Sequence, residues 1–563
     1  MTVATPIAVG IDLGTTISAS AWVQANGRSA MIQNRQGDIL TPSAVLFEDQ
    51  AILVGKEALK ARSTHPDRLA ELVKRDMGSP FYSKPILGNQ IPPEAIQACI
   101  LRQLQDDAAQ MLKAPFEVVI TVPAYFDDKR RRATAEAGEM AGLKVLDIVS
   151  EPTAAALAFG EELGYLTPSG LAQNRMRIVV YDLGGGTFDV TLVELAPGDF
   201  RAIATDGDVR LGGHDWDQRL ADYAAEQFIK MHRDDPRLDA KSLAMLLTEA
   251  EEAKINLSGQ RTARMRVEHG GQVLDVDVTR DQFEELTRDL LRRTSHTTAQ
   301  VLRTAGWKWN EVDKLLLVGG STRMPLVRRM LQEQSGLNLE HAVHPDEAVA
   351  RGAALYAQHL LSRRQVAEAA AAAKPAAPSQ ATRAAEINPA DPPNMVKPPA
   401  ASPPAAAPPP PLLSVTNVNA HSLGVQGIDV QNGRAKNVIL IPRNSALPAR
   451  KTKKFVTKVA GQKNLIVPVL EGESSVPSAC LQVGRMVVPN LPLDLPQGSA
   501  VLVTFEYGEN GRLSVRVQLP GSGLERRLEL ENESALSPEQ TAKWRQVLAS
   551  SGGLRQFGQA AAK

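Results

Sequence analysis

The chain has 563 residues, of which 63 are Lys or Arg and 63 are Asp or Glu. This balance gives no net field that would favour nucleic acid or an anionic membrane, and no apolar run approaches the ~20 residues of a membrane span. The N-terminus lacks the basic and cleavage-type segments of a signal peptide. The two cysteines, Cys99 and Cys480, argue against a disulfide framework or a cysteine metal site. We therefore expect a cytoplasmic protein of several domains that binds neither nucleic acid nor membranes.

The first informative element is an apolar, β-branched run at residues 7–11 that leads into Asp12-Leu13-Gly14-Thr15-Thr16. Such a run predicts a strand, and the glycine after it lets the backbone turn tightly with its N–H groups facing outward. Successive N–H groups in a turn form a concave anion site, to which threonine hydroxyls add donors. Asp12, at the strand end, is placed to hold a Mg²⁺ ion through its water shell.

A second loop of the same kind follows residues 178–181 and has the sequence Asp182-Leu183-Gly184-Gly185-Gly186-Thr187. One glycine-rich turn is commonly no more than a turn, but this copy repeats both the Asp-Leu-Gly lead and the threonine exit. Two such loops far apart in the chain indicate two similar lobes that clamp one polyphosphate. The sequence therefore predicts a nucleotide-binding cleft.

Residues 1 to about 364 alternate strand-like and helix-like patterns, as expected of a doubly wound α/β protein. The composition then changes: 30 of the 46 residues from Val366 to Pro411 are Ala or Pro, and none is aromatic. The start of this segment, residues 368–373, is expected to prolong the preceding helix. The rest cannot bury a core and is predicted to be an extended, mobile tether.

Residues from about 412 to 531 are rich in Val, Leu, Gly and Pro and predict a set of short strands. Clear strands are expected at 465–470, 500–507 and 513–519, with a glycine-containing hairpin turn between the last two. This pattern predicts an all-β domain after the tether.

Five segments of the first 360 residues together resemble the 70 kDa heat-shock chaperone family, a member of the actin and sugar-kinase superfamily. They are Gly10–Thr16, Thr121–Phe126, Glu151–Ala156, Asp182–Asp189 and Val318–Pro325. The resemblance implies an α/β fold with four regions. These are a two-lobed actin-like (ribonuclease H-like) ATPase domain at 1–365, a flexible linker at 366–411, a β-sandwich substrate-binding-like domain at 412–533, and a short helical remnant of a lid at 534–563.

The last region is much shorter than the helical lid of the family. Ser537-Pro538-Glu539-Gln540 has N-cap and first-turn chemistry, and one helix is expected to run from there to about Ala549. Without a full lid a bound peptide should leave faster, because residence time is mainly a property of the dissociation rate.

Hydrolysis of a γ-phosphate depends mostly on positioning and charge neutralisation around an in-line water. The resemblance implies that Lys74 contacts the γ-phosphate, that Glu151 orients water and Mg²⁺, and that Asp189 flanks the attacking water. The implied catalytic residues are Lys74, Glu151, Asp182, Thr187 and Asp189, and the implied metal-binding residues are Asp12, Glu151 and Asp182. The implied cofactors are ATP or ADP, Mg²⁺ and K⁺.

The nucleoside is expected on one face of a helix, because Glu251, Lys254 and Ser258 have i, i+3, i+7 spacing. The resemblance adds Arg323 on the opposite side, where a planar guanidinium can stack on a base. The implied nucleotide-binding residues are Asp12, Gly14, Thr15, Thr16, Gly184, Gly185, Gly186, Thr187, Gly212, Gly213, Glu251, Lys254, Ser258, Gly319, Gly320, Ser321, Arg323 and Asp346.

Pro123 and Arg131 match the proline switch and relay arginine through which the family reports nucleotide state. Two positions depart from the family pattern. Asp147 stands where an arginine usually docks a J-domain, and Ser414 stands where an acidic residue closes the interdomain linker. A J-domain co-chaperone and a nucleotide exchange factor are the implied partners, and the reversed charge is expected to weaken the J-domain contact. The long tether also departs from the family and would span roughly 35–40 Å.

In the sandwich the resemblance places a peptide groove at Val425, Ile428, Lys458, Leu465 and Val467. Lys458 aligns with a small residue in the family, which implies a charged rim. The expected ligands are unfolded or apolar polypeptide segments. Apolar strand residues are more commonly core, and that alternative stays open for the groove residues.

Two functions fit the sequence. The first is an ATP-dependent molecular chaperone that binds and hydrolyses ATP to regulate peptide capture. The alternative is an ATPase whose sandwich is a fixed adaptor or assembly module. A small-molecule kinase or a filament-forming actin relative is disfavoured by the match through Pro123 and Glu151. Whether apolar peptides bind, and whether ATP releases them, would separate the first two.

Overall fold

The structure is a computed structural model of the 563-residue chain. It describes all residues except 1–5, 167–173, 340–343, 373–412, 430–431, 493, 509–511, 521, 530–535 and 550–563. Most of the predicted tether therefore lies outside the described residues. Its alanine-rich start continues helix α10 (Ala348–Ala372), which confirms the predicted prolongation of that helix.

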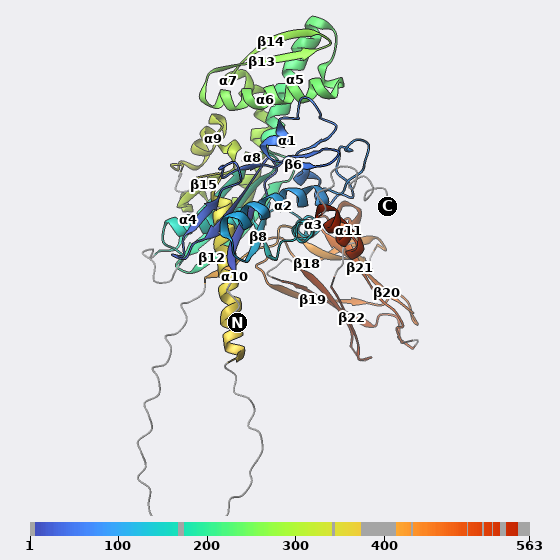
Figure 1. The fold of residues 1–563 in the computed structure, drawn as a ribbon. Coiled ribbons are helices and arrows are strands. Elements are labelled where there is room, and N and C mark those ends of the chain that lie inside the picture. The colour runs from blue at the N-terminus through green and yellow to red at the C-terminus, as the bar shows by residue number, and fades with distance from the viewer. Residues whose placement is uncertain are drawn as a thin grey trace, which may run out of the picture.

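The first lobe contains a sheet with the strand order β3-β2-β1-β8-β9 (Figure 1). These strands are β1 (Ile7–Asp12), β2 (Ile17–Val23), β3 (Ser29–Ile32), β8 (Phe116–Val122) and β9 (Val145–Ser150), and β4 (Thr41–Pro42) also pairs with β2. Strands β1, β8 and β9 run parallel. Helices α2 (Pro93–Leu112) and α3 (Asp128–Met140) pack on one face of this sheet.

The second lobe contains a sheet with the strand order β15-β10-β11-β12-β16. Its strands are β10 (Met176–Leu183), β11 (Phe188–Ala196), β12 (Asp199–Asp208), β15 (Lys314–Val318) and β16 (Ser414–Thr416). Along β10, Val179 and Tyr181 enter the outer core of this lobe, whereas Ile178 and Val180 enter a core shared with the first lobe. Alternate residues of a strand point to opposite faces, so an unbroken apolar run is what a doubly covered strand requires.

Two helices lie between the sheets, α4 (Glu151–Glu162) and α10, and their small residues let the layers approach closely. A Cβ atom at Gly352 would overlap the carbonyl of Ala154, and one at Gly10 would overlap the α10 backbone. This central layer places the ends of β1 and β10, and hence the two glycine-rich loops, opposite each other.

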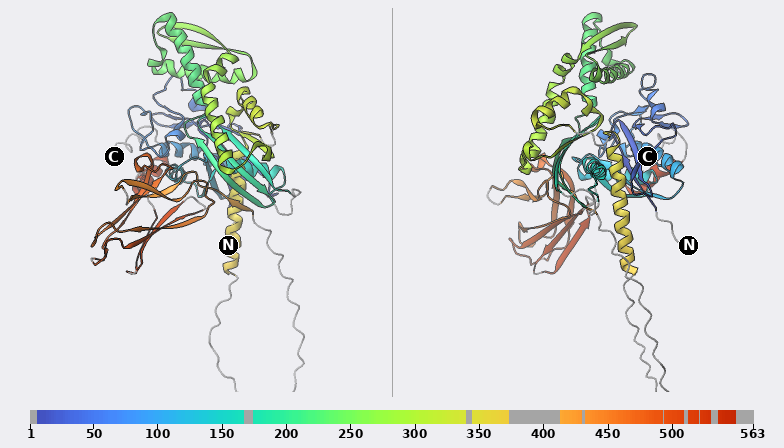
Figure 2. Two further views of the ribbon diagram at one scale, coloured as in Figure 1. Left: turned by 180° about the vertical axis from the view of Figure 1, so that it is seen from behind. Right: turned by 90° about the vertical axis from the view of Figure 1, so that its left-hand side faces the viewer.

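Helices α8 (Arg288–Ala305) and α9 (Pro325–Ser335) pack in the outer core of the second lobe. Helix α1 (Lys56–Leu59) and strands β5 (Val45–Phe47), β6 (Ile52–Val54) and β7 (Leu69–Ala70) belong to the first lobe. The far end from the sandwich is formed by α5 (Gly213–His232), α6 (Ala240–Gly259), β13 (Thr262–His269), β14 (Gln272–Thr279) and α7 (Arg280–Leu286) (Figure 2). Among the described residues, no helix is long and apolar enough to cross a membrane.

The C-terminal domain is a sandwich of two four-stranded sheets with the orders β18-β17-β20-β21 and β19-β22-β23-β24. Its strands are β17 (Leu423–Ile428), β18 (Ala435–Ile441), β19 (Ala449–Val456), β20 (Leu465–Glu471), β21 (Leu481–Val488), β22 (Ala500–Tyr507), β23 (Leu513–Leu519) and β24 (Leu524–Glu529). Alternate residues such as Val467, Val469, Val501, Val503 and Phe505 form the core between the sheets. The three strands predicted most clearly from the sequence are β20, β22 and β23.

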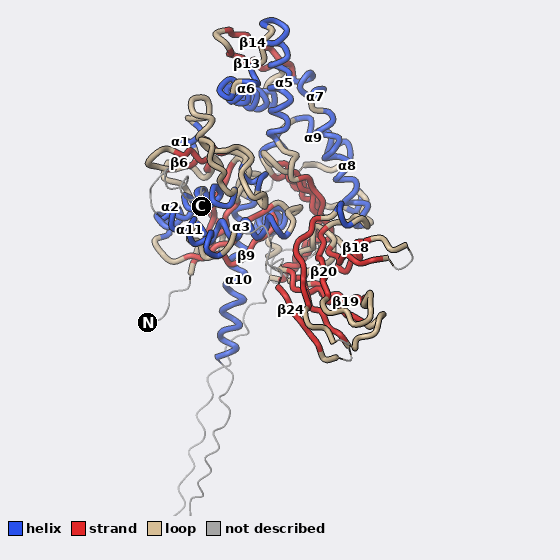
Figure 3. The backbone as a smooth tube through the Cα atoms, turned by 90° about the vertical axis from the view of Figure 1, so that its right-hand side faces the viewer, coloured by secondary structure: helices blue, strands red, loops and turns tan. Residues whose placement is uncertain are grey.

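The sandwich packs against the ATPase domain at three places. Strand β16 extends the second-lobe sheet by pairing in parallel with β12, and Leu413 and Val415 pack into the shared core. Helix α11 (Pro538–Ala549), which starts and ends as predicted, lies beside α2 and α3 (Figure 3). There Trp544 is buried, and the Arg545 guanidinium donates to the Glu139 carbonyl. The third contact, between the loops of both domains, is described with the site below.

Candidate functional site

A cavity of about 460 Å³ lies between the two lobes of the N-terminal domain. The predicted residues that line it are Asp12, Gly14, Thr15, Thr16, Lys74, Glu151, Asp182, Gly184, Gly185, Thr187, Glu251, Lys254, Ser258, Gly319, Gly320, Ser321, Arg323 and Asp346. The predicted residues Gly186, Gly212, Gly213 and Asp189 are not in this lining. Gly212 packs against the Gly186 backbone, so closely that a Cβ atom would overlap it.

The two glycine-rich loops touch each other across the cleft, and this contact explains their glycines. A Cβ atom at Gly185 would overlap the Thr16 side chain, and one at Gly186 would overlap Thr15. The Ser321 hydroxyl also donates to the Gly184 carbonyl over 2.9 Å. Backbone N–H groups from both lobes therefore line one polar cleft, which is the arrangement that a polyphosphate requires.

At the base of the cleft, Lys74 and Glu151 form a buried ion pair. Lys74 lies on a 3₁₀ turn, Val73–Asp76, and Glu151 is the first residue of α4. The helix start is fixed by its sequence, because Ser150 caps it and Pro152 occupies its first turn, where a missing N–H costs nothing. The carboxylate of Glu151 is thus held rigidly beside the lysine.

Three further carboxylates surround this pair. Asp12 accepts a hydrogen bond from the Thr121 hydroxyl over 3.1 Å, and Asp189 accepts one from the backbone N–H of Tyr125 over 2.9 Å. Asp182 and Asp189 are directly paired residues of β10 and β11. Burial, and next the neighbouring Glu151, raise the pKa of Asp12 to about 7. The same two causes raise the pKa values of Asp182 and Asp189 well above the usual range.

This excess of buried negative charge fits a divalent cation. Asp12, Glu151 and Asp182 offer oxygen ligands, which Mg²⁺ prefers, and a bound cation would favour their ionised forms. Among the described residues, no three His, Cys, Asp or Glu side chains converge as a direct metal cage. Any Mg²⁺ ion bound here would need water or phosphate oxygens to complete its ligand set.

The three residues predicted to contact the nucleoside lie on α6 and line the cavity. The Lys254 ammonium donates to Asp217 over 2.9 Å and to the Gly213 carbonyl over 3.3 Å. The Ser258 hydroxyl donates to the Lys254 carbonyl of the preceding turn. Across the cavity, Arg323 forms a two-point ion pair with Asp346, with the shorter distance 2.7 Å. These charged groups surround the end of the cavity away from Lys74.

Sequence reasoning missed two arginines of the first lobe. The Nη1 atom of Arg62 donates to the Glu251 carboxylate over 2.9 Å, and its Nε atom donates to Glu71 over 3.0 Å. Arg75 donates to the Gly186 carbonyl over 3.1 Å. Arg62 and Glu251 are 189 residues apart, so no local pattern could reveal a pair that exists only where the lobes meet.

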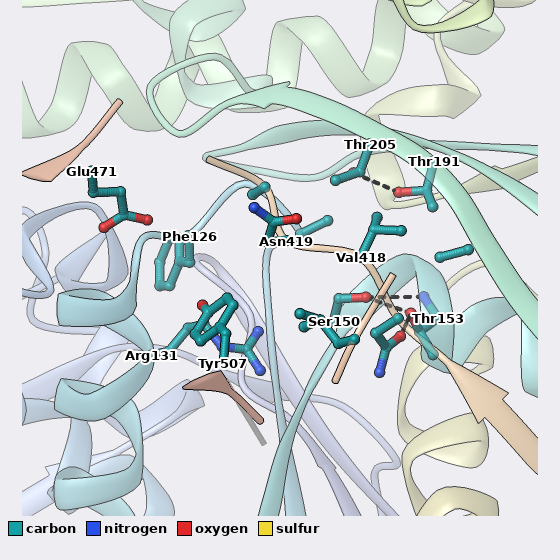
Figure 4. Close-up of a pocket in the computed structure, with 15 residues that line it drawn as sticks. Phe126, Arg131, Ser150, Thr153, Thr191, Thr205, Val418, Asn419, Glu471 and Tyr507 are labelled. Atoms are coloured by element: carbon teal, nitrogen blue, oxygen red, sulfur yellow. Dashed lines mark hydrogen bonds between the residues drawn. The ribbon is translucent and has the colours of Figure 1, made fainter. Parts of the chain in front are cut away.

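Of the two predicted relay residues, Arg131 lies at a small cavity of about 40 Å³ where the sandwich meets the ATPase domain (Figure 4), and Pro123 is not in the lining of that cavity. Arg131 lines this cavity and donates to the Ile148 carbonyl over 2.8 Å. The Thr153 hydroxyl, two residues after Glu151, donates to Asn417 over 2.9 Å. The loop that begins at Pro123 enters the same interface.

That loop connects Asp189, which is predicted to be catalytic, to the sandwich through Tyr125. The backbone N–H of Tyr125 binds Asp189, and the Tyr125 ring lies against the His421 ring with centroids 4.3 Å apart. A ring nitrogen of His421 also lies 3.3 Å from the Tyr125 carbonyl oxygen. Beside it, Arg443 forms an ion pair with Asp206 over 2.9 Å.

The predicted groove residues occupy different environments. Val425 and Val467 are buried in the sandwich core, Leu465 is half-buried, and Ile428 and Lys458 are exposed. With the sandwich packed on the ATPase domain, the predicted groove residues therefore lie partly in the core and partly at the surface.

The two departures from the family pattern both lie in structured positions. Asp147 accepts a hydrogen bond from the Tyr356 hydroxyl over 3.1 Å. The backbone N–H of Ser414 donates to the Gly198 carbonyl over 2.8 Å, which holds the linker on β12.

A family model for the Hsp70 protein matches residues 8–371 and 413–551. The chain belongs to the Hsp70 family. It is 37% identical over 543 residues to the chaperone protein DnaK of Thermotoga neapolitana, covering 94% of this chain and 81% of the relative. It is 36% identical over 544 residues to DnaK of Thermotoga maritima, with 94% and 81% covered. For DnaK of Thermosipho melanesiensis the identity is 35% over 546 residues, with 95% and 82% covered.

Membership of this family confirms the predicted fold class and function. The chain is an ATPase and an ATP-dependent chaperone of the Hsp70 type, which binds nucleotide and Mg²⁺. Relatives that align along almost the whole chain, sandwich included, do not favour the adaptor alternative. Unfolded peptides and co-chaperones are its partners in general terms.

Replacing Lys74 with Ala or Glu151 with Gln should lower single-turnover hydrolysis by at least about 100-fold while nucleotide affinity stays nearly unchanged. Both groups act on the charge that develops in the transition state, and removing one such group typically costs about 10²–10³ in rate. Lys84→Ala, an exposed lysine of the same lobe, is the control. Hydrolysis at the wild-type rate in either variant would contradict the assignment.

Arg62→Ala should speed nucleotide release by up to about fivefold, because the Arg62–Glu251 pair closes the cavity and a half-exposed ion pair contributes at most about 1 kcal/mol. Turnover at saturating ATP should not change, since the nucleoside end does not react. The measurement is release of a fluorescent ATP analogue in a stopped-flow instrument. Arg68→Ala removes a pair with Asp49 within one lobe and should leave release unaltered.

Docking of the sandwich should weaken as pH rises, because Glu471 is buried against α3. Burial, and next Asp127, Asp128 and Glu473, raise the pKa of the Glu471 carboxyl well above its usual range. The buried Tyr507 also interacts with Glu471, and Arg131 and Arg132 lie close to that tyrosine. The docked form therefore holds a proton that the undocked form releases. Between the two pKa values the docking constant should fall by up to about tenfold per pH unit.

Fluorescence energy transfer between labels on the two domains, in ATP, measures this docking. Glu471→Gln keeps the shape without the charge, so its docking should change little with pH and should exceed that of the wild type at high pH. An unchanged pH profile in the variant would show that other groups control docking.

Proposed function

We propose that nucleotide state is transmitted to the sandwich of this Hsp70 chaperone through Asp189, Tyr125 and His421. The supporting observation is the short path described above, in which one residue contacts both a catalytic carboxylate and the sandwich. A shift of Asp189 that accompanies loss of the γ-phosphate moves the Tyr125 backbone, and the ring of Tyr125 then repositions His421.

In the proposed mechanism the chain's own groups do four things. The N–H groups and hydroxyls of the two loops bind the phosphates, and Lys74 neutralises charge on the γ-phosphate. Glu151 and Asp189 orient the attacking water, with Thr187 beside it. Asp12, Asp182 and Glu151 would hold the waters of a Mg²⁺ ion, whose chemistry is to neutralise phosphate charge. A K⁺ ion near the phosphates is part of this proposal, and turnover in K⁺ against Na⁺ buffers tests it.

We further propose four functional regions: the ATPase domain at 1–365, a linker at 366–411, the peptide-binding sandwich at 412–533 and a lid remnant at 534–563. Pairing of β16 with β12 supports a linker that docks on the ATPase domain despite its length. A covalent tether holds the two domains at a high effective concentration. This concentration is near the millimolar range for a short flexible chain and lower for a longer one. Packing of α11 on α3 supports a remnant that does not cover the groove.

The proposed partners are unfolded apolar segments, a nucleotide exchange factor and a J-domain protein. The carboxylate of Asp147 supports a J-domain contact weaker than in family members that carry an arginine there. Ser414, which replaces the acidic residue at the end of the linker, is also proposed to weaken this contact. A cytoplasmic location is proposed because both cysteines are free thiols.

His421→Ala should abolish most of the stimulation of ATP turnover by an apolar peptide while basal turnover stays within about twofold. The substitution removes the ring that contacts Tyr125 and leaves the backbone N–H bond to Asp189 in place. His296→Ala, an exposed histidine on α8, is the control. Stimulation that survives in His421→Ala would reject this path, and no stimulation in the wild type would reject the coupled chaperone cycle.

A further inference from the structure

The sandwich carries a concentration of positive charge that the neutral composition of the chain conceals. Residues 434–463 contain nine Lys or Arg residues and no Asp or Glu. In a chain with 63 of each sign, a stretch of this length would carry about as many acidic as basic residues. The excess is therefore local, and it falls on two edge strands and the loop that follows them.

Six lysines of this stretch are exposed, and we call them together the lysine face. They are Lys436, Lys451, Lys453, Lys454, Lys458 and Lys463. On β19, Lys451 and Lys453 lie on one side of the strand and Lys454 lies on the other, so positive charge flanks this edge of the sandwich from both sides. Across the described part of the chain, none of the six lysines forms an ion pair. By contrast, Arg443 pairs with Asp206 of the ATPase domain, and Arg450 pairs with Glu506 of β22. The Lys453 ammonium donates to the Ile439 carbonyl over 3.5 Å.

The lysine face borders exposed apolar residues. Ile428, Val456 and Val459 are 54%, 52% and 52% exposed. The ends of β17 and β19 that carry Ile428 and Val456 are neighbours, because an added Cβ atom at Gly427 would be 3.6 Å from the Phe455 ring. Val459 lies in the loop after β19, which projects from the sandwich on the right of Figure 3. The end of the sandwich where the groove was predicted therefore carries both lysines and these three exposed apolar residues, which we call the apolar strip.

Lysines on edge strands also have a general role, because they prevent edge-to-edge pairing of sheets. That role accounts for the three lysines on β19. It does not account for Lys458 and Lys463 in the loop, or for the absence of every acidic residue over thirty positions.

We propose that the sandwich selects polypeptide segments in which a short apolar stretch is flanked by acidic residues. This inference rests on the proposed function of the sandwich as a peptide-binding domain. The apolar strip would bury the uncharged side chains, and the unpaired lysines would attract the flanking carboxylates. A basic segment would meet like charge on both sides of the strip and would be rejected.

Other anionic ligands fit less well. Single-stranded nucleic acid is bound by stacking bases on exposed aromatic rings, and the one aromatic residue of this stretch, Phe455, is half-buried. A membrane surface attracts basic segments without needing an apolar strip of strand width. The combination of strip and lysines favours an extended acidic peptide.

The test uses three fluorescent peptides that share one seven-residue apolar core and carry acidic, neutral or basic flanks. Binding to the full-length chain in ADP is measured by anisotropy. With four acidic flanking residues, the acidic peptide should bind at least about tenfold more tightly than the basic one at low salt, since exposed pairs contribute up to about fivefold each. The ratio should approach one in 0.5 M salt, where charges are screened.

A variant with Lys451→Glu, Lys454→Glu and Lys463→Glu should invert the preference while basal ATP turnover is unchanged. The matched control, Lys230→Glu with Lys241→Glu and Arg303→Glu, changes the net charge equally at exposed sites of the ATPase domain and should keep the acidic preference. If the first variant does not fold, the salt dependence of the wild-type affinity ratio still tests the proposal.

Equal affinity for the three peptides would overturn the inference and leave the peptide-binding function intact. Failure to bind even the neutral peptide would instead reject that function. Anionic lipid vesicles and an oligo-dT strand are measured in parallel. If either binds the wild type through the three lysines while the peptides show no acidic preference, the lysine face serves that ligand and the proposal is wrong.

Discussion

The cleft between the lobes depends on gathering four carboxylates around the ammonium group of Lys74: Glu151, Asp182 and Asp189 are buried, and Asp12 is half-buried. Buried charge is costly unless it is paired, and one lysine cannot neutralise four acids. Packing and hydrogen bonding in the rest of the domain therefore hold these carboxylates together. Asp182 and Asp189 are held opposite each other by the register of β10 and β11, and Glu151 is held by the capped start of α4.

The same constraint explains why the site needs nucleotide and Mg²⁺ to complete it. Without a cation, burial and mutual repulsion raise the pKa values of Asp12, Asp182 and Asp189. A bound cation would reverse that balance by favouring the ionised carboxylates, which come from both lobes. The neighbouring glycines allow the two loops to approach closely, because any larger residue would separate them.

Interdomain contact uses the ends of the elements that carry the site. Strand β8 leads to Pro123 and Tyr125, α4 carries both Glu151 and Thr153, and β12 pairs with the linker strand β16. Changes at the phosphates therefore have a short mechanical route to the sandwich. The far end of the sandwich, with its lysine face, is free of this interface, so ligand selection there can differ from relatives without altering the ATPase site.

The sequence by itself determined the elements and most of the nucleotide site. Two Asp-Leu-Gly loops, the i, i+3, i+7 spacing on α6, the alternating strands of the sandwich and the start of α11 are local patterns, and local patterns follow from backbone geometry. Only the tertiary structure decided the Arg62–Glu251 pair, the contact of Tyr125 with His421 and the burial of Glu471. These depend on which distant surfaces meet. That choice is made by the packing of whole layers, and no short stretch of sequence records it.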